Sequence, residues 1–336
     1  MRLEHRSVMM QEVVDNLLTN TSGLYVDATY GAGGHSTALL GSLGPKGRVI
    51  ALDCDQSIRF ARTSDPRAAA GHANFRELSW YLRCAEIYGA DGIVADLGVS
   101  STQVNDAQRG LSYLHPGPLD MRVDPTRSVP LSGRLRRTEL GTLHSSLRCH
   151  GLYGRTKAAA SRILQIVRQA RYTTTLDVAT AACCMHTQGM HIAADAFRAL
   201  RSMANSEPQC LRSLVRNAPA VLKPGGRLLI LTFDSYGERL VKASIEHAHS
   251  LVLMRTVSPT QREVATNASA RSSLLHVLRS AGNPRSAAPS DTRPSGRVSA
   301  TCARKPYVSI AAPSCHGGND NGDAARSASR HYACAP

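Results

Sequence analysis

A glycine-rich turn at residues 26–36 has the clearest potential for chemistry in this sequence. An apolar strand runs into Gly31, Gly33 and Gly34, and a helix is predicted to begin directly after them. Glycine lets the backbone approach a ligand closely because no Cβ intrudes, and a helix N-terminus presents unpaired N–H groups. The same pattern also fits a tight strand–helix turn that binds nothing. The turn is therefore a candidate nucleotide site that needs support from other residues.

Two carboxylates supply that support. Asp53 ends the next apolar strand, twenty residues after Gly33, where an acidic residue can accept hydrogen bonds from ribose hydroxyls. Asp96 ends a third strand. Ligands of open α/β sheets lie at the carboxyl ends of the strands, so we expect Gly33, Asp53 and Asp96 to converge on one crevice. For Asp96 alone, a helix cap or a loop acceptor is the alternative.

This arrangement serves NAD and S-adenosylmethionine alike. Polar Asp27 and Thr29 precede the first glycine, whereas dinucleotide sites usually run apolar up to it, and Ser36 replaces the third glycine of G-x-G-x-x-G. A late apolar segment at 225–233 also resembles the penultimate strand of Rossmann-like methyltransferases. These features favour S-adenosylmethionine, and an NAD-dependent oxidoreductase remains an alternative.

The elements that must position these residues alternate between strand and helix. Apolar runs predict strands at 24–29, 47–53, 90–98 and, after a Lys-Pro-Gly-Gly turn signal, 225–233. Helices are predicted at 36–43 and from 57 to 62. This alternation indicates an α/β fold with a parallel sheet covered by helices.

The middle of the chain has helical character instead. Amphipathic segments at 157–170 and 193–205 predict two of its helices. We expect residues 1–103 and 206–280 to form one discontinuous domain and 104–205 to be a helical insertion. Residues 281–336 are rich in Ala, Ser, Pro, Gly and Arg without periodicity, which predicts a disordered tail.

Positive charge is concentrated in the predicted insertion. The chain has 336 residues and a net charge of +15, of which 104–205 contribute +8 and 1–103 contribute −2. Such an excess favours a polyanionic partner, and an arginine-rich solvent face without a partner is the alternative. The densest part of this region holds Arg134, Arg136, Arg137, Arg148, Arg155, Lys157, Arg162, Arg168 and Arg171.

Composition argues against several other classes of protein. The nine cysteines include no C-x-x-C pair, so neither a disulfide framework nor a metal site is expected and a reducing compartment fits better. No apolar run reaches the roughly 18 residues of a membrane span. The first residues include Glu4, Glu12 and Asp15 and lack a continuous apolar stretch, so no secretory or transit peptide is expected. A cytoplasmic protein is the expectation.

A block at 117–126, Gly-Pro-Leu-Asp-Met-Arg-Val-Asp-Pro-Thr, is the most specific motif in the chain. With the motifs around it, this block resembles the ribosomal RNA small-subunit methyltransferase H family, also called MraW. The resemblance covers residues 5–278 in the family's order, and the tail lies outside it. The further motifs that carry it are 5–13, 30–36, 96–101 with Gln103, 108–113, 205–207, 222–227 and 270–273.

The resemblance implies a Rossmann-like, S-adenosylmethionine-dependent methyltransferase sheet with an inserted α-helical domain. It implies as target the exocyclic N4 of a decoding-centre cytidine in small-subunit ribosomal RNA, which we expect to be read in an assembled subunit. It leaves monomer and homodimer open, and it allows a mitochondrial matrix location beside the cytoplasmic one. The family's donor contacts carry over to Gly33, Gly34, His35, Asp53, Phe75, Asp96 and Gln103.

Methylation of a cytosine amine requires alignment with the methyl group and an acceptor for the amine's proton. The candidate acceptors are Asp96, the Ser100/Ser101 turn, and Asp120 or Asp124 in the 117–126 block. We expect Asp96 to lie at the donor, and Asp120 with Arg122 to organise the substrate side. A purely structural salt-bridge cluster of Asp120, Arg122 and Asp124 is the alternative.

Some positions depart from the family's pattern. Asp234 replaces a usual His, the segment 153–156 lacks an expected acidic pair, and 191–201 keeps only part of its motif. These changes fall where RNA is expected to dock. They motivate a second hypothesis, a non-catalytic protein that binds ribosomal RNA or the small subunit.

Overall fold

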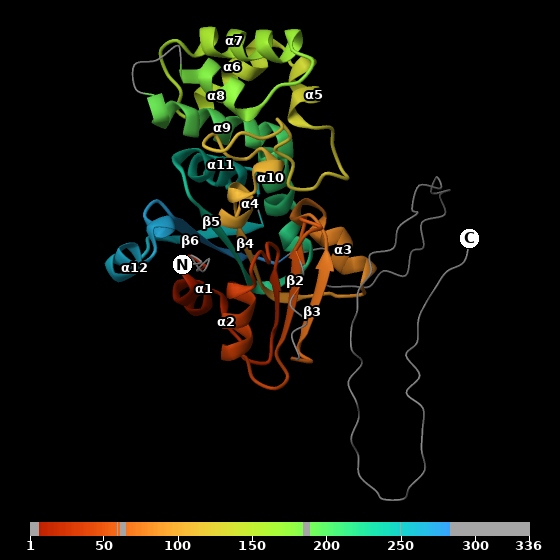
Figure 1. Ribbon diagram of the computed structural model, residues 1–336. Helices are drawn as coiled ribbons and strands as arrows, with labels where there is room; N and C mark the ends of the chain where they lie inside the picture. The colour runs from red at the N-terminus through yellow and green to blue at the C-terminus, as the bar shows by residue number, and fades with distance from the viewer. Residues whose placement is uncertain (1–6, 59, 61–64, 184–188, 249, 283–336) are drawn as a thin grey trace, which may run out of the picture.

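The computed structural model describes residues 7–58, 60, 65–183, 189–248 and 250–282 (Figure 1). The predicted tail, apart from its first two residues, lies outside the described residues. The helix predicted from residue 57 is wrong as far as the structure describes it. Asp55 bonds Ser57 through both the backbone N–H and the hydroxyl of that serine, and residues 56–57 form a turn. This side-chain bonding competes with helix formation.

Seven strands form one sheet in the order β3-β2-β1-β4-β5-β7-β6. The first five strands are parallel along the sheet, while β7 runs antiparallel to both β5 and β6. Four of these strands were predicted from the sequence, and the Rossmann-like α/β class is confirmed. The strands are β1 (Leu24–Asp27), β2 (Arg48–Asp53), β3 (Ala68–His72), β4 (Ala90–Asp96), β5 (Leu222–Thr232), β6 (Leu251–Val257) and β7 (Leu274–Ser280).

Helices cover both faces of this sheet because its central strands are apolar on both sides. In β5, Leu228 and Ile230 pack on one face, while Leu229 and Leu231 pack on the other. The first face is covered by α3 (Leu78–Cys84), α10 (Glu207–Asn217) and α11 (Ser235–Glu246). The second is covered by α1 (Met10–Leu17) and α2 (Gly34–Ser42), and α12 (Gln261–Thr266) follows β6.

The Lys-Pro-Gly-Gly signal, predicted to be a turn before the strand at 225–233, lies inside β5 instead. Ala90 pairs with Leu222 and Gly92 pairs with Arg227, so β5 bulges where β4 runs straight. Gly225 has φ 81°, a conformation that glycine adopts without strain. The turn residues therefore kink β5, an inner strand whose pairing with β4 continues before and after the bulge.

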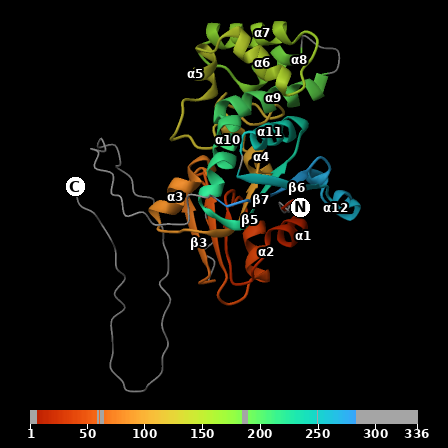
Figure 2. The ribbon, with the colours of Figure 1, turned by 180° about the vertical axis from the view of Figure 1, so that it is seen from behind.

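A second group of helices lies beyond the end of the sheet, with α4 (Ser101–Asn105) between the two parts (Figures 1 and 2). Its helices share their own apolar core, which includes Leu143, Ile163 and Leu200. The helices predicted at 157–170 and 193–205 are present as α7 and α9. That a separate insertion spans 104–205 stays a prediction. The group consists of α5 (Leu131–Arg136), α6 (Leu140–Cys149), α7 (Thr156–Gln169), α8 (Thr175–Cys183) and α9 (Gly189–Asn205).

Within the described part of the chain, no helix combines the length and apolar character needed to cross a membrane.

Candidate active site

The glycine turn after β1 is built for close backbone approach. Gly33 has φ 82°, and a Cβ there would lie 2.6 Å from the ring of Tyr30. A Cβ on Gly34 would clash with the side chain of Ser7. Gly33 also caps α2, so the N–H groups of the first turn of that helix point toward this turn. No larger residue fits at either position without moving its neighbours.

Buried polar contacts hold this turn against two strands. Asp27 is completely buried and accepts a hydrogen bond of 2.6 Å from the hydroxyl of Ser36. Burial raises the pKa of the Asp27 carboxyl. Thr29 Oγ1 accepts a bond of 2.7 Å from the backbone N–H of Asp96. These contacts fix the glycine turn relative to the end of β4, a positioning role of Asp27 and Thr29 that was not predicted from the sequence.

Asp53 lies on the other side of the turn, as predicted. Its two carboxylate oxygens accept bonds of 2.8 Å from the N–H groups of Gly31 and Asp55. Burial raises the pKa of this carboxyl. A carboxylate has about four acceptor positions, so two remain for hydroxyl groups of a ligand. The contacts of Thr29 and Gly31 thus bring Gly33, Asp53 and Asp96 to one edge of the sheet.

The Asp96 carboxylate is the uncommitted acceptor of this edge. Among the residues that the structure describes, none donates a hydrogen bond to its side-chain oxygens. Burial raises the pKa of Asp96 to about 6, an effect that nearby His35 opposes and Asp27 reinforces. An unpaired, desolvated carboxylate at the end of a strand is a frequent feature of binding and catalytic sites.

Gln103 contacts Asp55 in the loop after β2. Its Nε2 donates to Asp55 at 2.6 Å, and its Oε1 accepts from the N–H of Ser100, closing the capping box of α4. Arg109 makes an ion pair of 2.8 Å with the same carboxylate. Burial raises the pKa of Asp55, but the bonds from Arg109 and Gln103 outweigh it and leave the pKa lowered. Gln103 therefore joins α4 to the donor side of the crevice.

The other two predicted donor contacts are packed into the fold. His35 is buried, and its Nε2 lies 2.9 Å from the carbonyl oxygen of Val8. Phe75 is half-buried in the short helix after β3 and packs against the core on one face of the sheet. For His35, the backbone N–H at the start of α2 is the group left to face the crevice.

Asp120 and Arg122 are paired with each other. The guanidinium of Arg122 contacts both Asp120 oxygens, at 2.6 and 2.7 Å. Its third nitrogen donates to the carbonyl oxygens of Pro125 and Ser128 at 2.6 Å. This geometry fixes the loop from 120 to 128, which is a structural role for the Asp120–Arg122 pair, whereas Asp124 pairs with Arg127. Burial raises the pKa of Asp120, but its bonds to Arg122 leave that pKa lowered.

Asn205 fastens the same loop to α9. Its Nδ2 donates to the carbonyl oxygen of Met121, and its Oδ1 accepts from the N–H of Val123, both at 2.8 Å. Met121 has φ 57°, so the loop is held in an unusual backbone conformation. Two motifs of the sequence, 117–126 and 205–207, are thus in direct contact.

A pocket of about 160 Å³ opens between the end of β4 and α9. The rings of Tyr113 and Phe197 meet edge to face in it, 5.8 Å apart. None of its residues was predicted from the sequence as a site residue, because only the fold brings these segments together. The pocket is lined by Val99, Val104, Leu111, Tyr113, Ala194, Phe197, Arg198 and Arg201.

Charged residues surround this pocket. Arg201 pairs with Glu207 at 2.8 Å, and Arg198 pairs with Asp195. Asp234, at the end of β5, caps α11 through the N–H of Gly237 and lies 4.0 Å from Arg198. Asp234 therefore connects the sheet to a wall of the pocket. In the described parts of the chain, no cluster of His, Cys, Asp and Glu could hold a metal ion.

Solved structures similar to this chain match it only weakly. TrmN from Thermus thermophilus is 13% identical with a TM-score of 0.41, over 81% of this chain and 48% of that chain. An rRNA methylase from Streptococcus thermophilus is 12% identical with a TM-score of 0.34, over 81% and 93%. Such low scores carry no argument about function.

Sequence relatives are far closer. The ribosomal RNA small subunit methyltransferase H of Tremblaya princeps is 86% identical over 293 residues, which are 87% of this chain and 99% of that protein. The profile of the MraW methylase family matches residues 2–281. This match spans the glycine turn, both strand-end carboxylates and the aromatic pocket, and the chain belongs to the MraW methylase family.

Proposed function

We propose that this chain transfers a methyl group from S-adenosylmethionine to the exocyclic N4 of a decoding-centre cytidine in small-subunit ribosomal RNA. Membership in a methylase family supports the reaction type, and the name of the Tremblaya princeps relative supports the RNA. The observation that carries the proposal is the uncommitted Asp96 carboxylate. It ends β4 beside the glycine turn, three residues before Val99 in the wall of the aromatic pocket.

The donor side of the crevice fits S-adenosylmethionine. At Gly33 and Gly34 a Cβ would clash with Tyr30 and Ser7, so the turn keeps this shape only with glycine, and the start of α2 offers N–H groups to a carboxylate. Asp53 keeps free acceptor positions for ribose hydroxyls. Gln103 and Arg109 hold the loop after β2 in place through Asp55. When bound, S-adenosylmethionine supplies a methyl carbon activated by a positive sulfur.

The chain's own task is to orient the amine and remove its proton. The N4 lone pair of cytosine is delocalised into the ring, so the amine is a weak nucleophile. Asp96, ionised above its pKa of about 6, accepts a hydrogen bond from N4 and takes the proton that N4 loses as the new N–C bond forms and the methyl–sulfur bond breaks. An acceptor aimed at the amine also aligns it for in-line attack.

The aromatic pocket is the proposed place for the target base. Paired or structured RNA hides its bases, so the cytidine must leave its stack before it can react. Tyr113 and Phe197 offer apolar and aromatic surface to a base, and Arg198 and Arg201 provide donors at the wall. Asp120 and Arg122 act indirectly, by fixing the loop that Asn205 ties to α9.

The domain organisation remains part of the proposal. Residues 1–103 and 206–280 form the methyltransferase domain, and the basic insertion 104–205 binds RNA. An assembled small subunit in the cytoplasm is the proposed substrate, because one cytidine in a short RNA offers little shape to recognise.

Labelled methyl transfer to small subunits that lack the modification tests this function. We expect label in N4-methylcytidine after nucleoside digestion, and its loss in Asp53→Ala and Asp96→Ala. Asp15 is an exposed carboxylate on α1, and Asp15→Ala is the matched control, which we expect to stay active. Absence of label from a protein that binds S-adenosylmethionine would favour the non-catalytic RNA-binding alternative. Label in another nucleoside would contradict the N4 assignment.

A further inference from the structure

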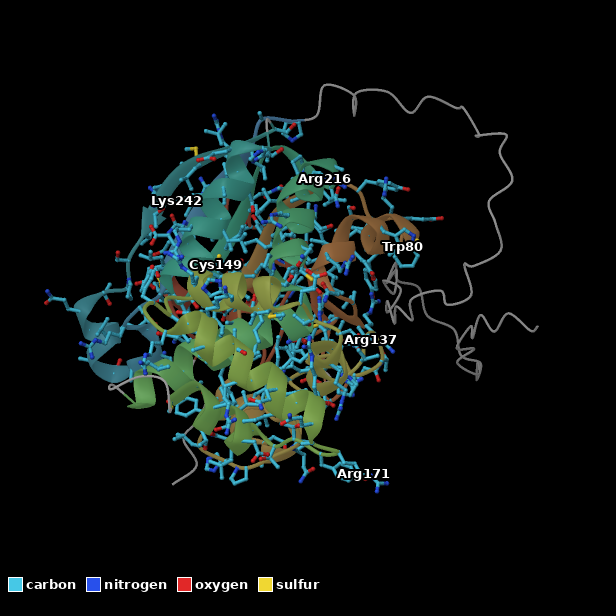
Figure 3. The ribbon with its side chains drawn as sticks, turned by 90° about the horizontal axis from the view of Figure 1, so that it is seen from above. Trp80, Arg137, Cys149, Arg171, Arg216 and Lys242 are labelled. Carbon is cyan, nitrogen blue, oxygen red and sulfur yellow. The ribbon has the colours of Figure 1, made fainter. Side chains whose placement is uncertain are left out.

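An exposed aromatic edge lies at the start of α8, away from the pocket. Tyr172 is 79% exposed and Leu176 is 52% exposed, so both present large side chains to solvent. The guanidinium of Arg171 lies over the Tyr172 ring, 5.5 Å from its centre. Arg171 projects outward at the rim of the helical group (Figure 3). We refer to Arg171, Tyr172 and Leu176 as the Tyr172 edge.

The chain around this edge is basic throughout. No acidic residue occurs from 140 to 176. Asp177 follows directly, and its carboxylate accepts bonds from the N–H and hydroxyl of Thr174. A polyanion approaching the edge therefore meets a positive surface that has few competing carboxylates. The basic residues of this stretch are Arg148, Arg155, Lys157, Arg162, Arg168 and Arg171.

Backbone contacts hold the edge rigidly. Arg136 donates to the carbonyl oxygen of Ala170 at 2.6 Å, and Arg168 donates to that of Thr138 at 2.6 Å. These two arginines join α5 and α7 to the segment that carries Tyr172. An aromatic side chain on such a support is preorganised for stacking and loses little entropy when a ligand binds.

The same edge is connected to the aromatic pocket. Thr174 forms a β-bridge with Pro118, and the hydroxyl of Thr175 donates to the carbonyl oxygen of His115 at 3.1 Å. His115 lies two residues after Tyr113 of the pocket wall. A ligand that spans both places would contact two segments that are hydrogen-bonded to each other.

We propose that the Tyr172 edge binds an unpaired nucleotide of the ribosomal RNA near the target cytidine. Tyr172 stacks on the base and Arg171 contacts its phosphate, while Leu176 extends the apolar surface. Stacking on aromatic side chains beside basic groups is the usual way that proteins hold single-stranded RNA. An acidic protein would match the charge but not the exposed ring. The inference rests on the proposed function and adds a second RNA contact to it.

Methyl transfer by Tyr172→Ala and Arg171→Ala tests the proposal. We expect roughly ten-fold higher KM for the RNA substrate with kcat unchanged, because the edge contacts RNA but not the reacting atoms. Tyr172→Phe retains the ring and restores KM. For Arg171→Ala, the slope of log affinity against log salt falls by about 1, since one phosphate contact is lost.

Two matched controls lie at the N-terminal ends of strands, away from the Tyr172 edge. Tyr88→Ala removes a ring that is 69% exposed just before β4, and Arg48→Ala removes an exposed arginine at the start of β2. Both should leave KM unchanged. Equal KM values for the Tyr172 edge variants, the controls and the unmodified protein would overturn the proposal.

Direct binding separates this proposal from the proposed function. A short single-stranded RNA oligonucleotide binds the unmodified protein more tightly than Tyr172→Ala, whether or not methyl transfer occurs. If the variants lose affinity for assembled subunits but bind naked RNA normally, the edge contacts a protein and the proposal is wrong. An inactive protein whose RNA affinity still depends on Tyr172 would contradict the proposed function alone.

Discussion

The hydroxyl of Thr29 accepts a hydrogen bond from the backbone N–H of Asp96, and the two atoms are 2.7 Å apart. The two residues are 67 positions apart in the chain; Thr29 lies two residues after β1, and Asp96 is the last residue of the neighbouring strand β4. This bond fixes the glycine turn relative to the one carboxylate of the crevice proposed to accept a proton. Because this hydrogen bond joins the glycine turn to the end of β4, we expect donor binding to depend on the position of Asp96.

Replacing Thr29 by Val tests this dependence. The isosteric change removes the acceptor and leaves the Asp96 N–H without its partner, which costs about 1–2 kcal/mol of folding free energy. We expect weaker S-adenosylmethionine binding in addition to this loss, measured by calorimetry beside denaturant unfolding. Thr37→Val on the exposed face of α2 is the control and changes neither quantity. Unchanged donor affinity in a destabilised Thr29→Val would limit the bond to a structural role.

Gly33 caps α2 and permits a second test of the donor site, with a control at Gly41 inside that helix. Gly33→Ala places a Cβ 2.6 Å from the Tyr30 ring at a backbone φ of 82°. We expect at least a ten-fold rise in the dissociation constant of S-adenosylmethionine, because the turn must shift. Gly41→Ala, with open space around the added Cβ, stabilises α2 by about 0.5–1 kcal/mol and leaves the affinity unchanged. Equal affinities in the two variants would refute close backbone approach at Gly33.

Much of the sheet could be predicted because its strands carry local signals. The sequence predicts β1, β2, β4 and β5 to within three residues, from continuous apolar runs. It misses β3, whose sequence Ala-Ala-Ala-Gly-His contains no β-branched residue. It also misses β6, which is mostly exposed at the edge of the sheet, where only the antiparallel pairing with β7 fixes it. Pairing of this kind depends on residues far away in the chain.

Asp96 also gives a prediction for stability. Its pKa is raised from 3.8 to about 6 by burial, so the ionised form is disfavoured in the folded protein. The stability that this group contributes is full below pH 4 and is lost as the pH rises through about 6, a difference of about 3 kcal/mol. Asp96→Asn should therefore be more stable than the unmodified protein at pH 7 but not at pH 4.

Denaturant unfolding at the two pH values measures this effect. Asp15→Asn on the surface of α1 serves as the control and shows no such crossover. A gain in stability on removing the carboxylate would be typical of a group retained for function. A loss of stability at pH 7 would mean that Asp96 has stabilising partners in the folded state.

The charge of Asp234 can be separated from its capping role. Asp234→Ala removes the hydrogen bond from Gly237, which lowers the free energy of unfolding by about 1 kcal/mol. Asp234→Asn keeps the cap, because Asn caps a helix as well as Asp does. Both variants remove the charge 4.0 Å from Arg198, so we expect both to raise the KM for RNA. Thr260→Ala, which uncaps α12, is the control that loses stability with KM unchanged. A normal KM in Asp234→Asn would remove this residue from substrate positioning.

The candidate site was only partly accessible from the sequence. Gly33, Asp53 and Asp96 follow strands, and the rule that parallel strands end at one edge suffices to place them together. Tyr113, Phe197 and Arg198 meet only because α9 packs across the end of β4, and no local pattern encodes that contact. The pairing of Asp120 with Arg122 was open as an alternative, since spacing alone does not show which side chains bond.

The pH dependence of a single turnover tests the central role of Asp96 most directly. With S-adenosylmethionine and RNA saturating, we predict a rate that falls tenfold per pH unit below about pH 6, where the carboxylate becomes protonated. Asp96→Asn should bind the donor but lose at least a hundred-fold in rate, with no break near pH 6. A variant that keeps the rate, or the same break near pH 6 in Asp96→Asn, would contradict this assignment.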